Sequence, residues 1–175
     1  MIEKWEKIKE ELVYNGYRKI SIWTFLQPNG KEVNLDIKIE NDAVCVLAQT
    51  ENKKFVMARQ YRPAPNMIMN ELPGGGSSDG DKSPEEGIKR EFLEETGFTG
   101  DFKLIGSSYN DCYSTRKRHH FVATNCRKIT EPKNDDTEFT EPVLLSLEEL
   151  KKSIEKGEIT DSETALRGLI YLKLL

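Results

Sequence analysis

Residues 71–98 read ELPGGGSSDGDKSPEEGIKREFLEETGF, a glycine-rich loop that runs into an acidic segment. The acidic segment carries the start and stop signals of one helix. Ser83 is a good N-cap, Pro84 suits the first helical position, and a glutamate two residues further on completes a capping box. Gly97 stands where a glycine commonly ends a helix. These signals predict a helix over roughly residues 84–96.

The predicted helix has two unlike flanks. Glu94 and Glu95 follow Glu91 by three and four residues, so the three carboxylates share one flank. Like charges at this spacing repel, and helix stability alone gives no reason to gather them. Ile88 and Phe92 lie on the other flank, which can pack on a sheet. Such a carboxylate face suits a hard divalent cation such as Mg²⁺, and the glycine loop can bring backbone groups to the same place. A solvated acidic face is the alternative.

The composition limits the classes of protein to consider. The chain has 175 residues, of which 37% are hydrophobic and 32% charged, and a formal net charge of −4. This length predicts a single domain over residues 1–175. The acidic balance disfavours nucleic acid and anionic membranes as partners. The three cysteines form no CxxC motif, which argues against a disulfide framework and structural zinc. The sequence has neither a signal peptide nor a window near the roughly 20 apolar residues of a membrane helix, so a cytoplasmic location is expected.

Strand signals dominate the rest of the chain. Apolar and alternating runs predict strands over residues 21–26, 33–39, 43–48, 55–61, 102–107, 119–124 and 142–147. Helical spacing predicts a helix over residues 2–13, another that opens at 146–150, and a last one over 162–175. Residues 1–40 would therefore hold an N-terminal helix and a hairpin, and the polar residues 131–140 a loop. Many strands with a few separate helices indicate an α+β fold or a mixed-sheet sandwich.

The second half of the 71–98 segment resembles a family signature. Arg90-Glu91-Phe92-x-Glu94-Glu95-x-Gly97-Phe98 matches the fixed positions of the Nudix box, and the chain is similar to the Nudix hydrolases. The resemblance implies the α+β Nudix fold, a mixed β-sheet sandwiched between helices, with an N-terminal β-hairpin extension. Counting back from Arg90 puts Lys82 where the family has a glutamate that steadies the loop, commonly through the box arginine. Alternatively, one residue is inserted and Asp81 takes this role.

Four flanking stretches resemble the ADP-ribose and nucleoside-diphosphate-sugar pyrophosphatases. They are residues 58–63 (ARQYRP), 70–75 (NELPGG), 136–141 (DTEFTE) and 159–165 (ITDSETA). The resemblance implies hydrolysis of the pyrophosphate bond of ADP-ribose or a nucleotide sugar, giving a nucleoside monophosphate and a sugar phosphate. A proline typical of this subgroup is absent from residues 109–116. An oxidised nucleotide or a dinucleoside polyphosphate as substrate, or a catalytically weakened nucleotide-binding module, are the alternatives.

The resemblance also assigns the metal ligands and the catalytic carboxylates. The metal, Mg²⁺ with Mn²⁺ as a substitute, would be held by Glu91, Glu94, Glu95 and the carbonyl of Gly74. The catalytic carboxylates would be Glu94, Glu95, Glu138 and Glu141. Among these, Glu138 would act on a loop as general base or further metal ligand, with Glu141 as the fallback.

Further residues are candidates for binding the substrate. The resemblance implies that Arg59 and Arg62 contact phosphates, with surface or structural ion pairs as the alternative, and that Glu71 lies near the substrate. Arg116 opens a basic cluster over residues 116–120, which can attract a polyphosphate or a phosphate-bearing sugar. A solvated hairpin turn is the alternative for this cluster.

The resemblance also bears on assembly. Related sugar-nucleotide enzymes are often dimers with exchanged N-terminal strands. Trp23 and Phe25, in the early predicted hairpin, are compatible with such an exchange. We therefore expect a homodimer that takes a small nucleotide-sugar substrate.

Overall fold

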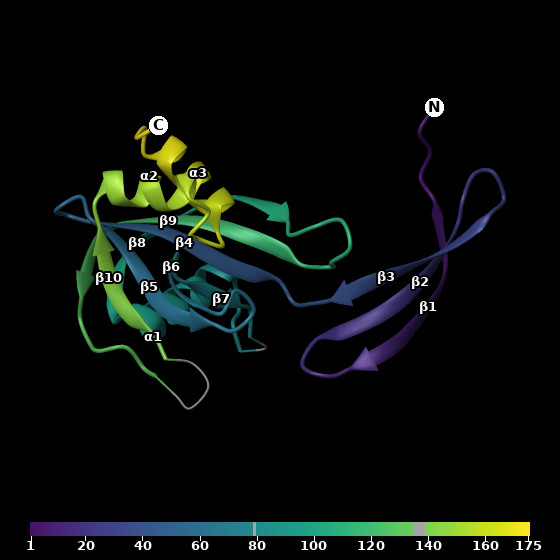
Figure 1. Ribbon diagram of the computed structural model, residues 1–175, viewed down its shortest axis with the longest axis horizontal. Helices are drawn as coiled ribbons and strands as arrows, with labels where there is room; N and C mark the ends of the chain where they lie inside the picture. The colour runs from purple at the N-terminus through teal and green to yellow at the C-terminus, as the bar shows by residue number, and fades with distance from the viewer. Residues whose placement is uncertain (79, 135–138) are drawn as a thin grey trace. The chain divides into compact units, whose positions relative to one another are not determined.

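Figure 1 shows the computed structural model of the chain, which describes residues 1–78, 80–134 and 139–175. In chain order the elements are β1 (Glu6–Asn15), β2 (Lys19–Leu26), β3 (Glu32–Ile39), β4 (Ala43–Thr50), β5 (Phe55–Arg62), β6 (Met67–Glu71), β7 (Gly74–Gly76), α1 (Pro84–Thr96), β8 (Phe98–Tyr109), β9 (Lys117–Lys128), β10 (Glu141–Leu145), α2 (Leu147–Glu155) and α3 (Ser162–Tyr171). None of the helices described here is both long and apolar enough to cross a membrane.

The chain divides into two compact units. The N-terminal unit comprises Met1–Asp42 and Ser108–Arg118, and the main unit comprises Ala43–Ser107 and His119–Leu175. The organisation as a single domain stays a prediction. Each unit has a sheet of its own, and the predicted chemistry, apart from that of Arg116, belongs to the main unit.

The N-terminal unit contains the early hairpin. Strands β1, β2 and β3 form an antiparallel sheet in that order. The turn between β2 and β3 is closed by hydrogen bonds between Gln27 and Lys31 and between Gly30 and Gln27, with Gly30 at a φ of 80°. Glycine adopts this conformation without steric conflict, which explains why it follows Pro28-Asn29 in the turn. The predicted hairpin is confirmed.

Strand β1 stands where the sequence predicts a helix over residues 2–13, and that prediction is wrong. The strand pairs with β2, and its register shifts between Lys7 and Lys9 and again between Leu12 and Tyr14. Each shift interrupts the period-two alternation of a strand. The apolar side chains then fall at intervals that imitate a helix, although pairing with β2 decides the structure.

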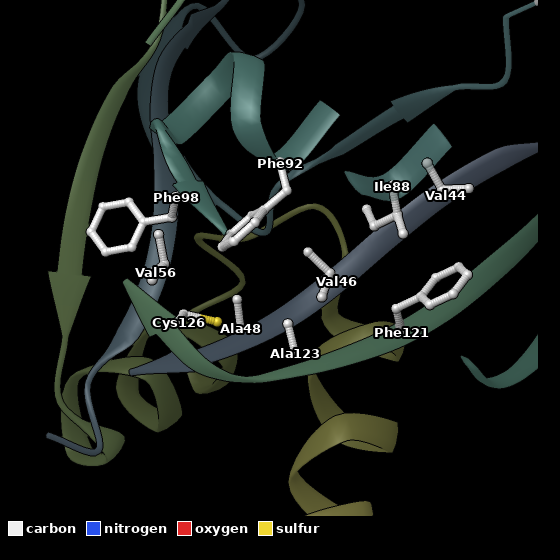
Figure 2. Close-up of a cluster of buried hydrophobic side chains, with 10 residues drawn as sticks. All are labelled: Val44, Val46, Ala48, Val56, Ile88, Phe92, Phe98, Phe121, Ala123 and Cys126. Carbon is white, nitrogen blue, oxygen red and sulfur yellow. The ribbon is translucent and has the colours of Figure 1, made fainter. Parts of the chain in front are cut away.

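The main unit is built around a sheet with strand order β10-β5-β4-β9-β8, to which β6 adds by pairing with β5 and β7 by pairing with β4. The central strand β4 is buried along almost its whole length. Its residues Val44, Val46 and Ala48 belong to a core cluster with α1, shown in Figure 2. Cys45 and Leu47 point the other way and pack with α2 and α3. The sheet is therefore sandwiched between helices, as predicted.

Most predicted elements of the main unit are confirmed, with ends that differ. Helix α1 spans the predicted residues 84–96, whereas β8 and β9 run several residues beyond the predicted strands. The strand predicted over residues 142–147 ends at Leu145 because Ser146 caps α2, in a capping box with Glu149. Helix α3 begins at Ser162 and ends at Tyr171, short of the predicted end.

Candidate active site

Helix α1 is held at both ends by the residues that predicted it. The Ser83 hydroxyl accepts a hydrogen bond from the N–H of Glu86 at 3.2 Å. The Glu86 carboxylate accepts from the N–H of Lys82 at 2.9 Å, one residue before the cap. Gly97 ends the helix in the left-handed conformation, and its N–H donates to the Leu93 carbonyl at 2.9 Å. These caps fix where the carboxylate flank of the helix begins and ends.

The glycine loop lies directly against two of the α1 carboxylates. The N–H of Gly74 donates to the Glu95 carboxylate at 2.8 Å, and Glu95 is 4% exposed. A Cβ added at Gly75 would lie 2.6 Å from the Glu91 carboxylate, and one at Gly74 would collide with the carbonyl of Val44. Only glycine permits this close approach. The structure thus brings Gly74, Glu91 and Glu95 together.

Arg90 connects the loop to the helix. Its guanidinium donates to both oxygens of Asp81, at 3.0 and 3.2 Å, and to Glu94 at 3.0 Å. It also lies 2.9 Å from the Glu91 carboxylate. Hydrogen bonds from Arg90, followed by the N–H of Ser78, hold the pKa of Asp81 well below its usual range. Asp81 in turn raises the pKa of Arg90.

Of the two residues that the sequence offered for steadying the loop, the structure pairs Asp81 with the box arginine. The Asp81 side chain is 8% exposed and accepts the N–H of Ser78 at 2.9 Å as well as the guanidinium of Arg90. Lys82 is exposed, and the bond described for it is the one from its backbone N–H to Glu86. The alternative with one inserted residue therefore matches the observed contacts.

The oxygen atoms at the loop are of the kind that a hard cation prefers. Glu91 and Glu95 supply carboxylates that lie against the glycine loop, and the carbonyl of Gly74, whose N–H binds Glu95, stays a predicted ligand. Glu94, the remaining predicted ligand, pairs with Arg90 at 3.0 Å and lies 3.9 Å from Lys133. Among residues 1–78, 80–134 and 139–175, no group of three or more His, Cys, Asp or Glu is placed to hold a metal ion. The two carboxylates fit Mg²⁺ in kind.

In the sequence, one candidate base falls between β9 and β10 and the other at the start of β10. Glu138 lies outside the described residues, and Glu141 is the exposed first residue of β10. The described parts of the segment between β9 and β10 are fastened to the end of α1. The N–H of Lys133 donates to the Glu94 carbonyl at 2.7 Å, and the Thr140 hydroxyl to the Glu95 carbonyl at 2.9 Å.

A further hydrogen bond ties the two described ends of this loop to each other. The N–H of Thr140 donates to the side-chain oxygen of Asn134 at 2.8 Å. Thr140 is 3% exposed. Sequence reasoning missed both residues because Thr140 and its partner Glu95 are 45 positions apart, and no local pattern reveals that contact.

Two of the predicted substrate-binding residues form one ion pair. The Nε of Arg62 donates to an oxygen of Glu71 at 2.5 Å, and Glu71 is 1% exposed. The other Glu71 oxygen accepts the Thr160 hydroxyl, also at 2.5 Å. Sequence reasoning missed this role of Thr160, because its partner lies 89 positions away. The ion pair that the sequence left open as an alternative for Arg62 is present.

The remaining predicted substrate-binding residues belong to different units. Arg59 is exposed, and across the sheet it stands opposite Asn70 of β6 on one side and Glu141 of β10 on the other. Arg116 belongs to the N-terminal unit, where its Nε donates to the Asn41 carbonyl at 2.7 Å and its Nη1 lies 3.6 Å from Glu40.

The sequence is similar to those of several known proteins. A family model described as "NUDIX domain" matches residues 40–167. An ADP-ribose pyrophosphatase of Bacillus subtilis (strain 168) is 32% identical over 150 residues, which cover 84% of this chain and 80% of that protein. A methanol dehydrogenase activator of Bacillus methanolicus is 30% identical over 171 residues, covering 95% and 91% of the two chains.

Two further matches extend the comparison. A GDP-mannose pyrophosphatase of Yersinia enterocolitica is 29% identical over 182 aligned positions, covering 95% of this chain and 94% of that protein. A solved structure of an ADP compounds hydrolase superposes with a TM-score of 0.81 over 100% of this chain and 96% of that chain, at 17% identity, which is a likeness of fold. The fold expected from the resemblance, with its N-terminal antiparallel extension, is confirmed. Because the family model spans most of the sequence, the chain belongs to the Nudix hydrolase family.

Proposed function

We propose that this chain hydrolyses the pyrophosphate bond of ADP-ribose or a related nucleotide sugar, with Mg²⁺ bound, to a nucleoside monophosphate and a sugar phosphate. One observation carries the proposal: Glu91 and Glu95 meet the glycine loop at Gly74 and Gly75. The names of two relatives, an ADP-ribose pyrophosphatase and a GDP-mannose pyrophosphatase, support the substrate class.

The proposed metal ligands are Glu91, Glu95 and the carbonyl of Gly74. Glu94 joins them if it exchanges Arg90 for the ion, since Arg90 now holds its carboxylate. When bound, the cation neutralises charge on the pyrophosphate and lowers the pKa of bound water. Mn²⁺ accepts the same oxygen donors and is the expected substitute.

The chain itself would supply a base and cationic contacts. Glu138 is the proposed general base, because it belongs to the segment between β9 and β10 whose described ends are bonded to α1. Glu141 is the fallback, because it directly follows Thr140, one of those ends. Arg59, which is exposed, and Arg62 are proposed to contact the phosphates. Glu71 acts next to the substrate by holding Arg62. Arg116 stays a predicted substrate contact.

The alternatives differ in what supports them. A lysine at position 82 would favour a catalytically weakened binding module if the loop depended on it, and the Asp81–Arg90 contact argues against that dependence. An oxidised nucleotide or a dinucleoside polyphosphate stays an alternative substrate. The homodimer and the cytoplasmic location stay predictions from the sequence.

Turnover of a substrate panel tests the proposal. The panel contains ADP-ribose, GDP-mannose, another nucleotide sugar, a dinucleoside polyphosphate and an oxidised nucleoside triphosphate, each with Mg²⁺ and with Mn²⁺. We expect ADP-ribose or a nucleotide sugar to give the highest kcat/KM, with a nucleoside monophosphate as a product. Preference for another panel member would overturn the substrate assignment.

A matched pair of variants tests the metal assignment. Glu95→Gln keeps an acceptor for the N–H of Gly74 but removes the charge, so we expect a normal fold and a loss of about 100-fold or more in kcat/KM. Glu148→Gln makes the same change at an exposed residue of α2 and is expected to leave turnover unchanged. Full activity of Glu95→Gln would contradict the assignment.

A further inference from the structure

Glu71 is a buried carboxylate whose two oxygens have different partners. One oxygen accepts the Nε of Arg62 and the other accepts the hydroxyl of Thr160, both at 2.5 Å. Glu71 is 1% exposed, so neither oxygen has appreciable access to water. A carboxylate in this position requires a donor on each oxygen to offset its desolvation. Thr160 therefore supplies a donor that the buried charge needs.

Arg62 is held by one nitrogen and leaves the rest of its guanidinium available. Its side chain is 40% exposed, and within the described part of the chain the Nε contact with Glu71 is the one bond recorded for it. The two terminal amino groups form the fork that binds phosphate and carboxylate through two parallel hydrogen bonds. Such a fork, fixed at its base and partly exposed, is suited to a phosphate group.

The two contacts of Glu71 depend on each other. A guanidinium beside a carboxylate tends to bind both oxygens in the two-pronged arrangement. Here the Thr160 hydroxyl donates to the second oxygen, and the contact of Arg62 with Glu71 is made through Nε. Without the hydroxyl, the second oxygen would draw an amino group of Arg62 toward itself. That rearrangement would withdraw the fork from any external anion.

We infer that Thr160 is a positioning residue for anion binding: by holding Glu71 it keeps the fork of Arg62 free for a phosphate of the substrate. The inference rests on the proposed function for the identity of that anion, the pyrophosphate group. Thr160 lies two residues before Ser162, the first residue of α3, and reaches Glu71 of β6 across 89 positions of sequence. The Asp161 carboxylate, at 3.1 Å, is the more distant acceptor for the same single proton.

Three variants isolate the hydroxyl. Thr160→Val removes it at nearly constant volume, Thr160→Ser retains it, and Thr164→Val makes the same deletion at a buried threonine that contacts His120 instead. The measurements are the Kd of inorganic pyrophosphate in excess Mg²⁺ by calorimetry, and kcat and KM for the preferred panel substrate. We expect Thr160→Val to raise Kd and KM about five- to tenfold with kcat nearly unchanged. Thr160→Ser and Thr164→Val should bind pyrophosphate like the wild type.

A double-mutant cycle separates positioning from a structural role. In an Arg62→Lys background the fork is absent, so Thr160→Val should add no further loss of pyrophosphate affinity. Additive losses, an unchanged Kd in Thr160→Val, or a loss in Thr160→Ser equal to that in Thr160→Val would overturn the inference. Thr160→Ala serves as a second deletion if the valine variant unfolds, as judged by its thermal transition.

The outcomes also separate this inference from the proposed function. If the wild type binds pyrophosphate in a Thr160-dependent way but hydrolyses no panel member, the proposed function fails and the positioning role stands. If the wild type hydrolyses a nucleotide sugar and Thr160→Val changes neither Kd nor KM, the positioning role fails and the function stands.

Discussion

Gly75 and Gly76 are neighbours in one loop, yet a side chain would meet different surroundings at the two positions. An added Cβ at Gly75 would lie 2.6 Å from the Glu91 carboxylate, whereas at Gly76 it would meet nothing within 4 Å. The carboxylate can yield because it ends a flexible side chain. Gly75→Ala should therefore displace Glu91 without unfolding the protein.

We predict that alanine at these two positions has different effects on activity. We expect Gly75→Ala to lower turnover about 10- to 100-fold and to raise the Mg²⁺ concentration needed for half-maximal rate, because misplacing a catalytic group by about 1 Å has effects of this size. Gly76→Ala should retain activity within about twofold of the wild type. Equal activities of the two variants would show that the loop does not act through Glu91.

Asp81 and Lys82 provide a second contrast between adjacent residues. Arg90 lowers the pKa of Asp81, so its carboxylate stabilises the folded state above its ordinary pKa of about 3.9 and loses this effect as pH falls below that value. Asp81→Asn should therefore lower the urea midpoint at neutral pH, and the difference from the wild type should shrink as the pH falls through the unfolded pKa toward the lower folded one. A midpoint difference independent of pH would contradict the role given to the Asp81 carboxylate.

Lys82→Glu should change kcat/KM by about twofold or less, because Asp81 already pairs with Arg90.

Single residues of the site could be predicted where their arrangement depends on neighbours that are close in the sequence. The spacing of Glu91 and Glu95 along one helix, behind a glycine loop, needed only the period of a helix. Thr160 was unpredictable because its partner lies 89 positions away, and Asp81 stayed one of two options because loop geometry decides which side chain reaches Arg90.

Helix α1 and strand β1 show how the same reasoning succeeds and fails for whole elements. The ends of α1 are set by Ser83 and Gly97, whose effects act within a turn of the helix. Strand β1 is set by its pairing with β2 and by two register shifts, which are invisible in its own sequence. Local signals therefore predict helix boundaries better than they predict irregular strands.

The described ends of the segment between β9 and β10 are hydrogen-bonded to the end of α1. The Thr140 hydroxyl donates to the Glu95 carbonyl, and the Thr140 N–H donates to Asn134. Thr140→Val removes the first bond, together with a 3.2 Å contact of the same hydroxyl with Asn134, and retains the second. If this loop carries the general base, we expect kcat to fall about tenfold with KM nearly unchanged, measured on the preferred substrate.

Thr130→Val is the matched control for this prediction, because Thr130 is an exposed residue whose described bond is made by its backbone N–H to Gly97. It should behave like the wild type. Thr140→Ser, which retains a hydroxyl, should recover most of the rate. A rise in KM with kcat unchanged would assign Thr140 to substrate binding instead of to the positioning of the general base.

For the whole molecule, the family match and the structural units have different extents. The family model begins at residue 40, close to the end of β3, whereas the N-terminal unit is made of Met1–Asp42 and Ser108–Arg118. The three-stranded sheet of that unit therefore lies outside the matched region. The family match therefore says nothing of the role of this sheet, and the exposed residues of the sheet are the guide to it.

That surface is unusual in strand β1, where all ten residues are exposed and β2 covers one edge. Ile8, Leu12 and Val13 of this strand are each between 44% and 51% exposed. An exposed edge strand with apolar side chains is a favourable surface for a second chain. The homodimer stays a prediction, and we predict that its contact includes β1.

Sedimentation velocity tests the expectation, which requires a species of twice the 20.1 kDa chain mass. Leu12→Lys puts a charge on β1, and Leu166→Lys makes the same change on α3 at a leucine that is 41% exposed. Because burying an unpaired lysine at an interface is costly, Leu12→Lys should shift the dimer toward monomer while Leu166→Lys leaves it intact. A monomeric wild type, or equal dissociation of both variants, would show that β1 does not form the contact between two copies of the chain.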